Sequence, residues 1–349
     1  MSFRDKLFKV SLIALCFMIL GMVLIGGLTR ITGSGLSIVE WKPITGFIPP
    51  LTHAEWVLEF SKYQSSPEFQ KINFGMTLAD FQSIYFLEYI HRLWGRLIGF
   101  VLLVPTFLMV FNSQHRALAP LLILLWILGF AQGLMGWIMV KSGLTHDPHV
   151  SPYRLSAHLF LGFMIFGVAL WMTLRIYQDR LTVKYAQIPL NPLKTASFIA
   201  LFLVLLTAQC GALVAGLKAG LLYNTFPMMG ESLVPREFLT QTPWWRDLFE
   251  NPVSVQFLHR LCAMATALFC GGLWMYQRKL NPFPALTNAF NAMMIMVVVQ
   301  VSLGILTLLF VVPPSLALLH QGVAFLVFGS LVYVMFLLEC VNIINDSGS

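Results

Sequence analysis

Long apolar stretches alternate with polar connections along this chain. An α-helix needs about 20 predominantly apolar residues to cross the hydrocarbon layer of a bilayer. The expected membrane helices cover residues 8–28, 87–111, 118–140, 155–176, 195–216, 254–276, 286–310 and 315–339. The sequence therefore predicts an all-α integral membrane protein with eight transmembrane helices.

Two polar segments, about residues 30–86 and 217–253, are much longer than the other connections. Lysine and arginine outside the apolar stretches are concentrated at the N-terminus and in the short connections on one side, while the long segments dilute theirs with acidic residues. Because cytoplasmic loops carry the excess of basic residues, we expect both termini in the cytoplasm and both long segments outside. No convincing cleavage site follows the first apolar stretch, so we expect that helix to be retained.

The amino-acid composition also indicates a membrane protein, and it argues against nucleic-acid binding and against cysteine-based sites. Of the 349 residues, 58% are hydrophobic and only 11% are charged, with a net charge of +7. A soluble domain has about 25% charged residues, and basic residues scattered through a membrane protein orient its helices rather than bind nucleic acid. The five cysteines lie in or at the end of apolar stretches, which indicates neither a disulfide framework nor a thiolate metal site.

The chain also contains an internal repeat. The segment around His91 and Arg92 recurs 168 residues later around His259 and Arg260, and the segment around His158 recurs 162 residues later around His320. The sequence predicts two pseudo-symmetric four-helix bundles, residues 1–180 and 181–349, as a parallel repeat with the same direction across the membrane.

Four of the eight histidines lie inside the expected membrane helices, about one turn from the long-segment end. They are His91, His158, His259 and His320, two in each half. A lone intramembrane histidine is most often a packing residue, but ionisable groups there are costly and commonly functional. Two imidazoles that face each other across a four-helix bundle are suited to axial binding of haem iron, whereas zinc prefers a tetrahedral ligand set.

Arginines accompany two of these histidines. Arg92 follows His91, Arg260 follows His259, and Arg96 lies one turn beyond Arg92. Guanidinium groups bind carboxylates through paired hydrogen bonds, which suits the two propionates of haem. The alternative is that these side chains only extend to the membrane interface.

Glu88 marks a difference between the halves, because Gln256 stands at the equivalent position. A carboxylate at the edge of the hydrocarbon needs a partner. We therefore expect Glu88 either to bind an arginine or to take part in proton transfer. A third interpretation is an acid at a helix N-terminus, favoured there by the helix dipole.

These motifs together resemble the haem A synthase family of bacterial and mitochondrial inner membranes. The matching stretches cover nearly the whole chain in order: GGLTRITGSGLSIVEWKPITGFIPP from residue 26, EYIHRLWGRLIG at 88–99, GWIMVKSGL at 136–144, SPYRLSAHL at 151–159, AGLKAGLLYNTFPMM at 215–229, QFLHR at 256–260 and LLHQG at 318–322. The long segments contain no cysteine pair, so the chain is similar to the cysteine-free branch found in proteobacteria and mitochondria.

The resemblance implies a substrate site and a cofactor site. In the family, the N-terminal bundle binds the substrate haem O, here between His91 and His158. The C-terminal bundle holds a haem B cofactor, here between His259 and His320. The reaction converts the C8 methyl group of haem O to a formyl group by successive hydroxylations, giving haem A for terminal oxidases, and Glu88 matches a glutamate treated as essential.

The same resemblance suggests where the protein works and with what. A bacterial cell inner membrane is the expected location. Expected partners are membrane lipid, a haem O synthase that hands over its apolar product, and an electron acceptor that the sequence does not identify, with a homo-oligomer left open. Nucleic acid is not an expected partner.

Two functions other than an enzyme fit parts of the sequence. A non-catalytic di-haem membrane cytochrome for electron transfer would need both histidine pairs, but it gives no reason for the difference between Glu88 and Gln256. A transporter built on a parallel repeat would be expected to have broken helices near the membrane midplane. Here the polar intramembrane residues cluster near one edge instead.

Overall fold

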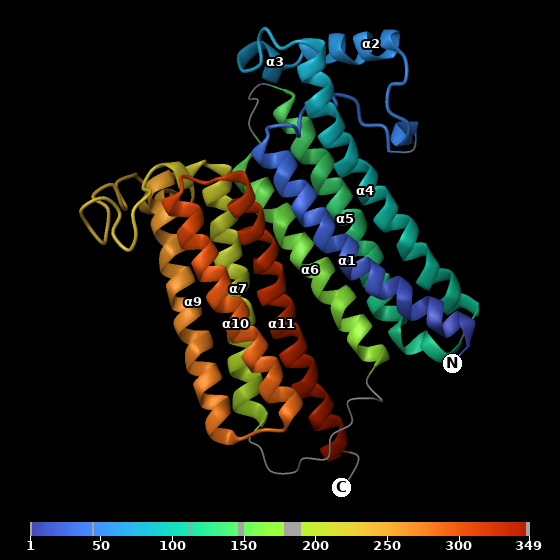
Figure 1. The fold of residues 1–349 in the computed structure, drawn as a ribbon, viewed down its shortest axis with the longest axis vertical. Coiled ribbons are helices and arrows are strands. Elements are labelled where there is room, and N and C mark those ends of the chain that lie inside the picture. The colour runs from blue at the N-terminus through green and yellow to red at the C-terminus, as the bar shows by residue number, and fades with distance from the viewer. Residues whose placement is uncertain (1, 44, 112, 146–149, 178–189, 347–349) are drawn as a thin grey trace.

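The computed structural model describes residues 2–43, 45–111, 113–145, 150–177 and 190–346. Among them are eight helices long and apolar enough to cross a membrane, as expected. They are α1 (Phe3–Ile31), α4 (Leu78–Phe111), α5 (Ala119–Gly143), α6 (Pro152–Ile176), α7 (Leu190–Gly216), α9 (Pro252–Leu280), α10 (Pro284–Leu309) and α11 (Pro314–Asp346) (Figure 1). The described residues form no sheet, so the protein is an all-α, multi-pass membrane protein.

Local sequence determines where several of these helices begin. Proline stands in the first turn of α5, α6, α9 and α10, where its missing N–H costs nothing and its fixed φ suits a helix. At the start of α9, the side chain of Asn251 accepts a hydrogen bond of 2.9 Å from the backbone N–H of Val253. At the start of α1, Ser2 accepts one of 3.1 Å from Asp5. These caps satisfy backbone donors that have no partner within the helix.

The membrane helices pack in two groups of four. In the first group, α1 packs against α4 and α6, and α5 packs against α6; in the second, α7 packs against α9 and α11, and α10 packs against α9 and α11. The groups meet where α6 contacts α7 and α11, and where α1 contacts α11 (Figure 1). Helix α11 contacts both groups and is the most buried of the eight spans. The predicted boundary between residues 180 and 181 lies outside the described residues.

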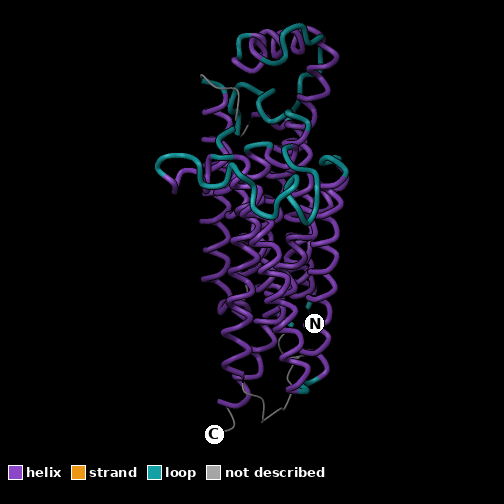
Figure 2. Tube along the Cα trace, turned by 90° about the vertical axis from the view of Figure 1, so that its left-hand side faces the viewer, coloured by secondary structure: helices purple, strands orange, loops and turns teal. Residues whose placement is uncertain are grey.

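Two loop segments, residues 32–77 and 217–251, lie at one end of the bundles, which we call the loop end (Figure 2). Helix α1 begins and α11 ends at the opposite end (Figure 1). The first loop segment contains η1 (Thr45–Phe47), α2 (His53–Gln64) and α3 (Pro67–Lys71), and the second contains η4 (Ala219–Leu221) and α8 (Trp244–Glu250).

The first loop segment has an apolar core of its own. It is formed by Ile38, Trp56, Tyr63, Phe69, Phe81 and Tyr85. The last two come from the beginning of α4, so this helix extends out of the membrane region and serves as one wall of the cluster.

Helix α4 therefore begins well before the expected start at residue 87. Its first turns, from Leu78, are too polar for an apolar window to detect, and they are stabilised by packing against α2 and α3. Glu88 consequently lies far inside the helix. The interpretation of Glu88 as an acid at a helix N-terminus is wrong, because the dipole effect is confined to the first turn.

Candidate functional site

Each of the four histidines packs against a glycine of a neighbouring helix in its own bundle. A Cβ atom added to the glycine would lie 3.1 Å from His91 at Gly26, 3.5 Å from His158 at Gly136, 3.0 Å from His259 at Gly211 and 2.9 Å from His320 at Gly304. Three of these distances are shorter than ordinary van der Waals contact, so the rings occupy space that any other residue would fill. Sequence analysis missed this role for the glycines, because it depends on how the helices cross.

The two histidines of the C-terminal pair lie at a spacing that would allow them to hold one metal ion between them. The ring centroids of His259 and His320 are 6.4 Å apart, and their planes are inclined at 87°. First-row metal ions bind imidazole nitrogen at about 2 Å, so two imidazoles on opposite sides of one iron have ring centroids roughly 6 Å apart. The residues present therefore fit a haem iron. Among the described residues, no group of three or more histidine, cysteine or carboxylate side chains is arranged so that it could hold a metal ion.

Backbone carbonyls fix the tautomers of this pair. Nδ1 of His259 lies 3.1 Å from the carbonyl oxygen of Thr207, and Nδ1 of His320 lies 3.2 Å from that of Gln300. A carbonyl oxygen only accepts hydrogen bonds, so each Nδ1 carries the proton and donates it. Each Nε2 then keeps a lone pair for a metal, which is the usual arrangement behind a histidine ligand.

The N-terminal pair is held differently. Nε2 of His158 lies 3.2 Å from the side-chain nitrogen of Gln132, and its Nδ1 is buried without a partner in the described structure. The Gln132 amide nitrogen can donate only to an unprotonated Nε2, so the lone pair of this nitrogen already accepts a hydrogen bond and would have to be released before it could bind a metal. Binding an iron at His158 would displace this weak contact, whereas the C-terminal pair needs no such change.

Glu88 is buried beside this N-terminal pair, with a relative exposure of 2%. One carboxylate oxygen accepts hydrogen bonds from the Ser37 hydroxyl at 2.7 Å and the Ile38 backbone N–H at 2.8 Å. The other forms an ion pair of 2.5 Å with Arg92, one turn further along α4. A carboxylate at the edge of the hydrocarbon needs a partner. Arg92 is that partner for Glu88.

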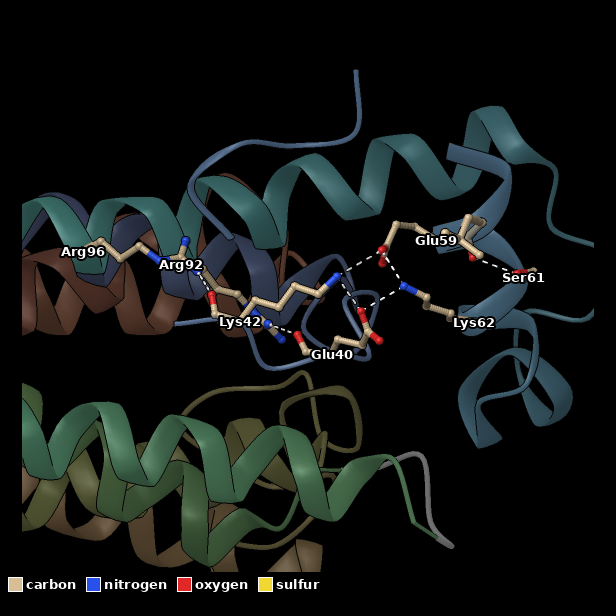
Figure 3. A network of polar contacts seen from close by, with 8 residues as sticks. Glu40, Lys42, Glu59, Ser61, Lys62, Arg92 and Arg96 are labelled. Atoms are coloured by element: carbon tan, nitrogen blue, oxygen red, sulfur yellow. Dashed lines mark hydrogen bonds and ion pairs between the residues drawn. The ribbon is translucent and has the colours of Figure 1, made fainter. Parts of the chain in front are cut away.

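Arg92 and Arg96 also hold the first loop segment in place. Arg92 donates to the carbonyl oxygen of Glu40 at 3.0 Å, and Arg96 donates to that of Lys42 at 2.9 Å (Figure 3). Arg92 also donates to the carbonyl oxygen of Ile38 at 2.8 Å, and Arg96 to that of Pro43 at 3.1 Å. One nitrogen of Arg96, Nη1, is buried without a partner in the described structure. Binding of haem propionates by these arginines remains a prediction, and their observed partners are backbone carbonyls.

Four charged side chains fasten the same loop to α2 (Figure 3). Lys42 and Lys62 each contact both Glu40 and Glu59, at distances between 2.5 and 3.5 Å. Hydrogen bonds from Lys42 and then Lys62 lower the pKa of Glu40, and the hydrogen bond to Glu59 contributes most to raising the pKa of Lys62. These groups are partly exposed, so each pair contributes little to stability alone.

A cavity of about 370 Å³ lies between this loop, α2 and α4. Its walls include Ile38, Tyr89, Arg92 and Arg96. Consecutive helix positions are separated by about 100°, so His91 lies on a different face of α4 from Arg92. Ile38 and Arg92, which both bind Glu88, line the cavity. Glu88 therefore lies between the cavity and the face of α4 that carries His91.

The C-terminal bundle repeats the loop anchor without the carboxylate. Arg260 donates to the carbonyl oxygens of Tyr223 at 2.7 Å and Thr225 at 2.8 Å. Gln256, at the position equivalent to Glu88, donates to the same Tyr223 carbonyl at 3.0 Å. The two bundles thus share the histidines and the arginine anchor, and they differ in the buried acid.

The remaining predicted chemistry is distributed as follows. All five cysteines are free thiols in this structure. Of the histidines outside the pairs, His53 is exposed in α2, and His115 is buried against Asp5 at the end opposite the loop end. His146 and His149 lie outside the described residues.

Comparison with known proteins agrees with these features. Residues 9–332 match the family described as cytochrome oxidase assembly protein. A protein named "Heme A synthase" from Rhodospirillum centenum is 44% identical over 96% of this chain and 89% of its own length. Proteins of the same name from Paramagnetospirillum magneticum and Nitrosospira multiformis are 46% and 41% identical, over 89% and 95% of this chain and 88% and 93% of their own lengths. With a match of this extent, the chain belongs to the cytochrome oxidase assembly protein family.

Proposed function

We propose that this protein is a haem A synthase, an oxidoreductase that converts the C8 methyl group of haem O to a formyl group by successive hydroxylations. The observation that carries this function is the combination of two equivalent histidine pairs with a buried carboxylate, Glu88, beside only one of them. The names of the relatives support the same reaction.

The two histidine pairs would bind different haems. We assign the substrate haem O to His91 and His158, and a resident haem B to His259 and His320. The carbonyl-fixed tautomers of the C-terminal pair suit a cofactor that stays bound, because that site is already organised for a metal. The Gln132 contact at His158 suits a ligand that enters and leaves.

Arginine donors remain for the propionates of both haems. Arg96 Nη1 in the N-terminal bundle and Arg260 Nε in the C-terminal bundle are buried without partners in the described structure. A buried guanidinium N–H is costly to leave unpaired and is a strong donor to a carboxylate. Arg92, which already has Glu88 and two carbonyls, would mainly position the acid and the loop.

In this reaction the haem O macrocycle supplies the redox chemistry. Each hydroxylation would replace a C–H bond of the methyl group with a C–O bond to water, and would release two protons and two electrons, the electrons going to a separate acceptor. Glu88 would take one of the protons, while Ser37, Ile38 and Arg92 hold its carboxylate in place. The adjoining cavity, which Ile38 and Arg92 line, would give the proton a way from Glu88 to the loop end. The first loop segment contacts Glu88 and Arg92 and would cover the site.

The location and partners follow from the same assignment. The protein would lie in a bacterial inner membrane with both termini in the cytoplasm. It would receive haem O from a haem O synthase and pass electrons to a separate acceptor. Because haem O is strongly apolar, transfer between two membrane proteins avoids exposing it to water.

The test is expression with a source of haem O in a host that makes no haem A, followed by extraction and identification of haems by chromatography and mass. Haem A or its hydroxymethyl intermediate should form with the wild type and disappear in Glu88→Ala and His91→Ala. His53→Ala, which removes an exposed histidine of the first loop segment, is the matched control and should retain activity. Recovery of haem B alone, with nothing oxidised by the wild type, would favour the di-haem cytochrome.

A further inference from the structure

The two bundles meet through a symmetric aromatic contact. The pattern His-x₄-Phe-x₂-Phe-Gly occurs in both α6 and α11, as His158, Phe163, Phe166 and Gly167 and as His320, Phe325, Phe328 and Gly329. Phe163 and Phe325 stack with ring centroids 3.8 Å apart and planes inclined at 12°. This contact fixes the helix that carries one histidine of the N-terminal pair against the helix that carries one histidine of the C-terminal pair.

Gln321 departs from that symmetry. Leu159 stands at its equivalent position after His158, whereas Gln321 follows His320 directly. Its side-chain nitrogen donates a hydrogen bond of 3.0 Å to the carbonyl oxygen of Val23, in α1 of the other bundle. Gly27 provides the space, because a Cβ at that position would lie 2.6 Å from the side-chain oxygen of Gln321.

The turn of α1 that receives Gln321 also supports the other histidine pair. Gly26 lies against the edge of the His91 ring that carries Nε2, because a Cβ added to Gly26 would lie 3.1 Å from that nitrogen. Adjacent residues of α1 thus contact His91 on one side and Gln321 on the other. The path from His91 to His320 consists of Gly26, Gly27 and Gln321, with a close contact or a peptide bond at each step.

Two other hydrogen bonds between the bundles involve residues that are not next to a histidine of either pair. Arg30 donates to the carbonyl oxygen of Ala215 at 2.8 Å, and Ser156 donates to the side chain of Gln209 at 2.7 Å. None of these four residues adjoins a histidine of either pair in sequence. Gln321 does, and its partner helix is in direct contact with the ring of His91.

We propose that Gln321 is a positioning residue that couples the two histidine sites, so that filling the site of His91 and His158 changes the properties of a haem bound by His259 and His320. The proposal rests on the proposed function in one respect, that both sites take haem. Iron binding by His91 would change the contact of its ring with Gly26, and the resulting shift in α1 would reach His320 through Gln321. The orientation of an axial imidazole tunes the metal it binds, and coupling between sites is reciprocal.

The experiment uses the purified full-length protein with haem in the C-terminal site. The midpoint potential of that haem is measured by spectroelectrochemical titration, first with the N-terminal site empty and then after addition of haem O. The wild type should show a shift, and His91→Ala, which cannot bind haem O normally, should show none. Both Gln321→Leu and Gly27→Ala should reduce the shift by more than half, because they break the same contact from opposite sides.

Two matched controls separate coupling from general damage. Leu159→Met changes the residue after the other histidine, and Gly99→Ala adds a Cβ to α4 where nothing lies within 4 Å. Both should keep the wild-type shift. Absence of a shift in the wild type, or a full shift in both Gln321→Leu and Gly27→Ala, would overturn the proposal. Haem A formation is assayed separately, so a shift that depends on Gln321 without any haem A would contradict the proposed function and leave the coupling intact.

Discussion

Arg92 and Arg260 occupy equivalent positions of the two repeats, and each donates hydrogen bonds to backbone carbonyls of the loop segment that precedes its own helix. Each arginine thereby anchors the loop segment of its own half at the loop end of the bundle. The residue one turn earlier makes the difference: Glu88 pairs with Arg92, while Gln256 binds the same carbonyl as Arg260. The reaction should therefore depend on the acid rather than on the anchor.

The first prediction concerns Glu88→Gln, which keeps the size of the side chain and introduces the residue of the C-terminal half. Haem A formation should fall by about 100-fold or more, the usual effect of removing a general base. Haem bound by His259 and His320 should remain at the wild-type level, as measured by the haem content of the purified protein. Glu59→Gln removes a carboxylate from the neighbouring α2 and should leave haem A formation close to normal; equal losses in both variants would contradict the role of Glu88.

The second prediction concerns the glycines behind the histidines. Gly304→Ala places a Cβ 2.9 Å from a ring atom of His320, whereas Gly136→Ala places one 3.5 Å from His158, in ordinary contact. Overpacking costs about 1–3 kcal/mol, so Gly304→Ala should lower the haem occupancy of the C-terminal site, and Gly136→Ala should leave binding at the N-terminal site nearly unchanged. The ratio of haem to protein measures both, and a loss as large in Gly136→Ala would show that the contact distances do not decide the effect.

The eight membrane helices could be predicted from the sequence because each depends only on length and apolar character. The start of α4 could not, because its first turns are polar and are held by packing against residues far away in the chain, such as Trp56. The true start excludes the helix-terminal acid, and the ion pair with Arg92 agrees with one of the two roles expected for Glu88 from the sequence.

In the functional site, too, some features could be predicted from the sequence and others could not. The four histidines were visible as a repeat, but the role of Gly304 depends on a helix crossing, and that of Gln321 depends on the approach of the two bundles. The sequence contains one signal for the contact between the bundles: the repeated His-x₄-Phe-x₂-Phe-Gly pattern, which includes the stacked Phe163 and Phe325. Repeats of aromatic residues near candidate ligands indicate where two halves meet.

The third prediction concerns that stacked pair. Phe163 and Phe325 are almost completely buried, at 1% and 0% exposure. Phe→Ala in a packed core costs about 3–5 kcal/mol, and within a membrane the loss is mainly one of packing contacts. Phe163→Ala and Phe325→Ala should each destabilise the protein, and the double variant should lose less than the sum, because both remove one contact.

Reversible unfolding in mixed micelles measures this effect. Phe130→Ala is the matched control, because Phe130 is 76% exposed in α5 and would face lipid. It should change the free energy of unfolding little. Additive losses in the double variant would mean that the two rings do not stabilise the interface through each other.

The fourth prediction concerns pH and the first loop segment. Burial, reinforced by the charge of Glu88, raises the pKa of Glu68 to about 7 from its ordinary value of 4.5. Glu68 is only 6% exposed and accepts a hydrogen bond of 3.1 Å from the hydroxyl of Tyr63. The folded segment therefore keeps a proton on Glu68 that the unfolded segment releases between these two pH values.

The sign follows from this difference in bound protons. The segment should be most stable below pH 4.5, lose stability as the pH rises toward 7, and change no further above that, with a total loss of about 3 kcal/mol. Hydrogen exchange of residues 53–71 at pH 5 and pH 8, corrected for intrinsic exchange, measures it. Glu68→Gln should remove the dependence and stabilise the segment at pH 8. Glu55→Gln, which changes an exposed acid of the same segment, should preserve it, and an unaltered pH dependence in Glu68→Gln would assign the effect to another group.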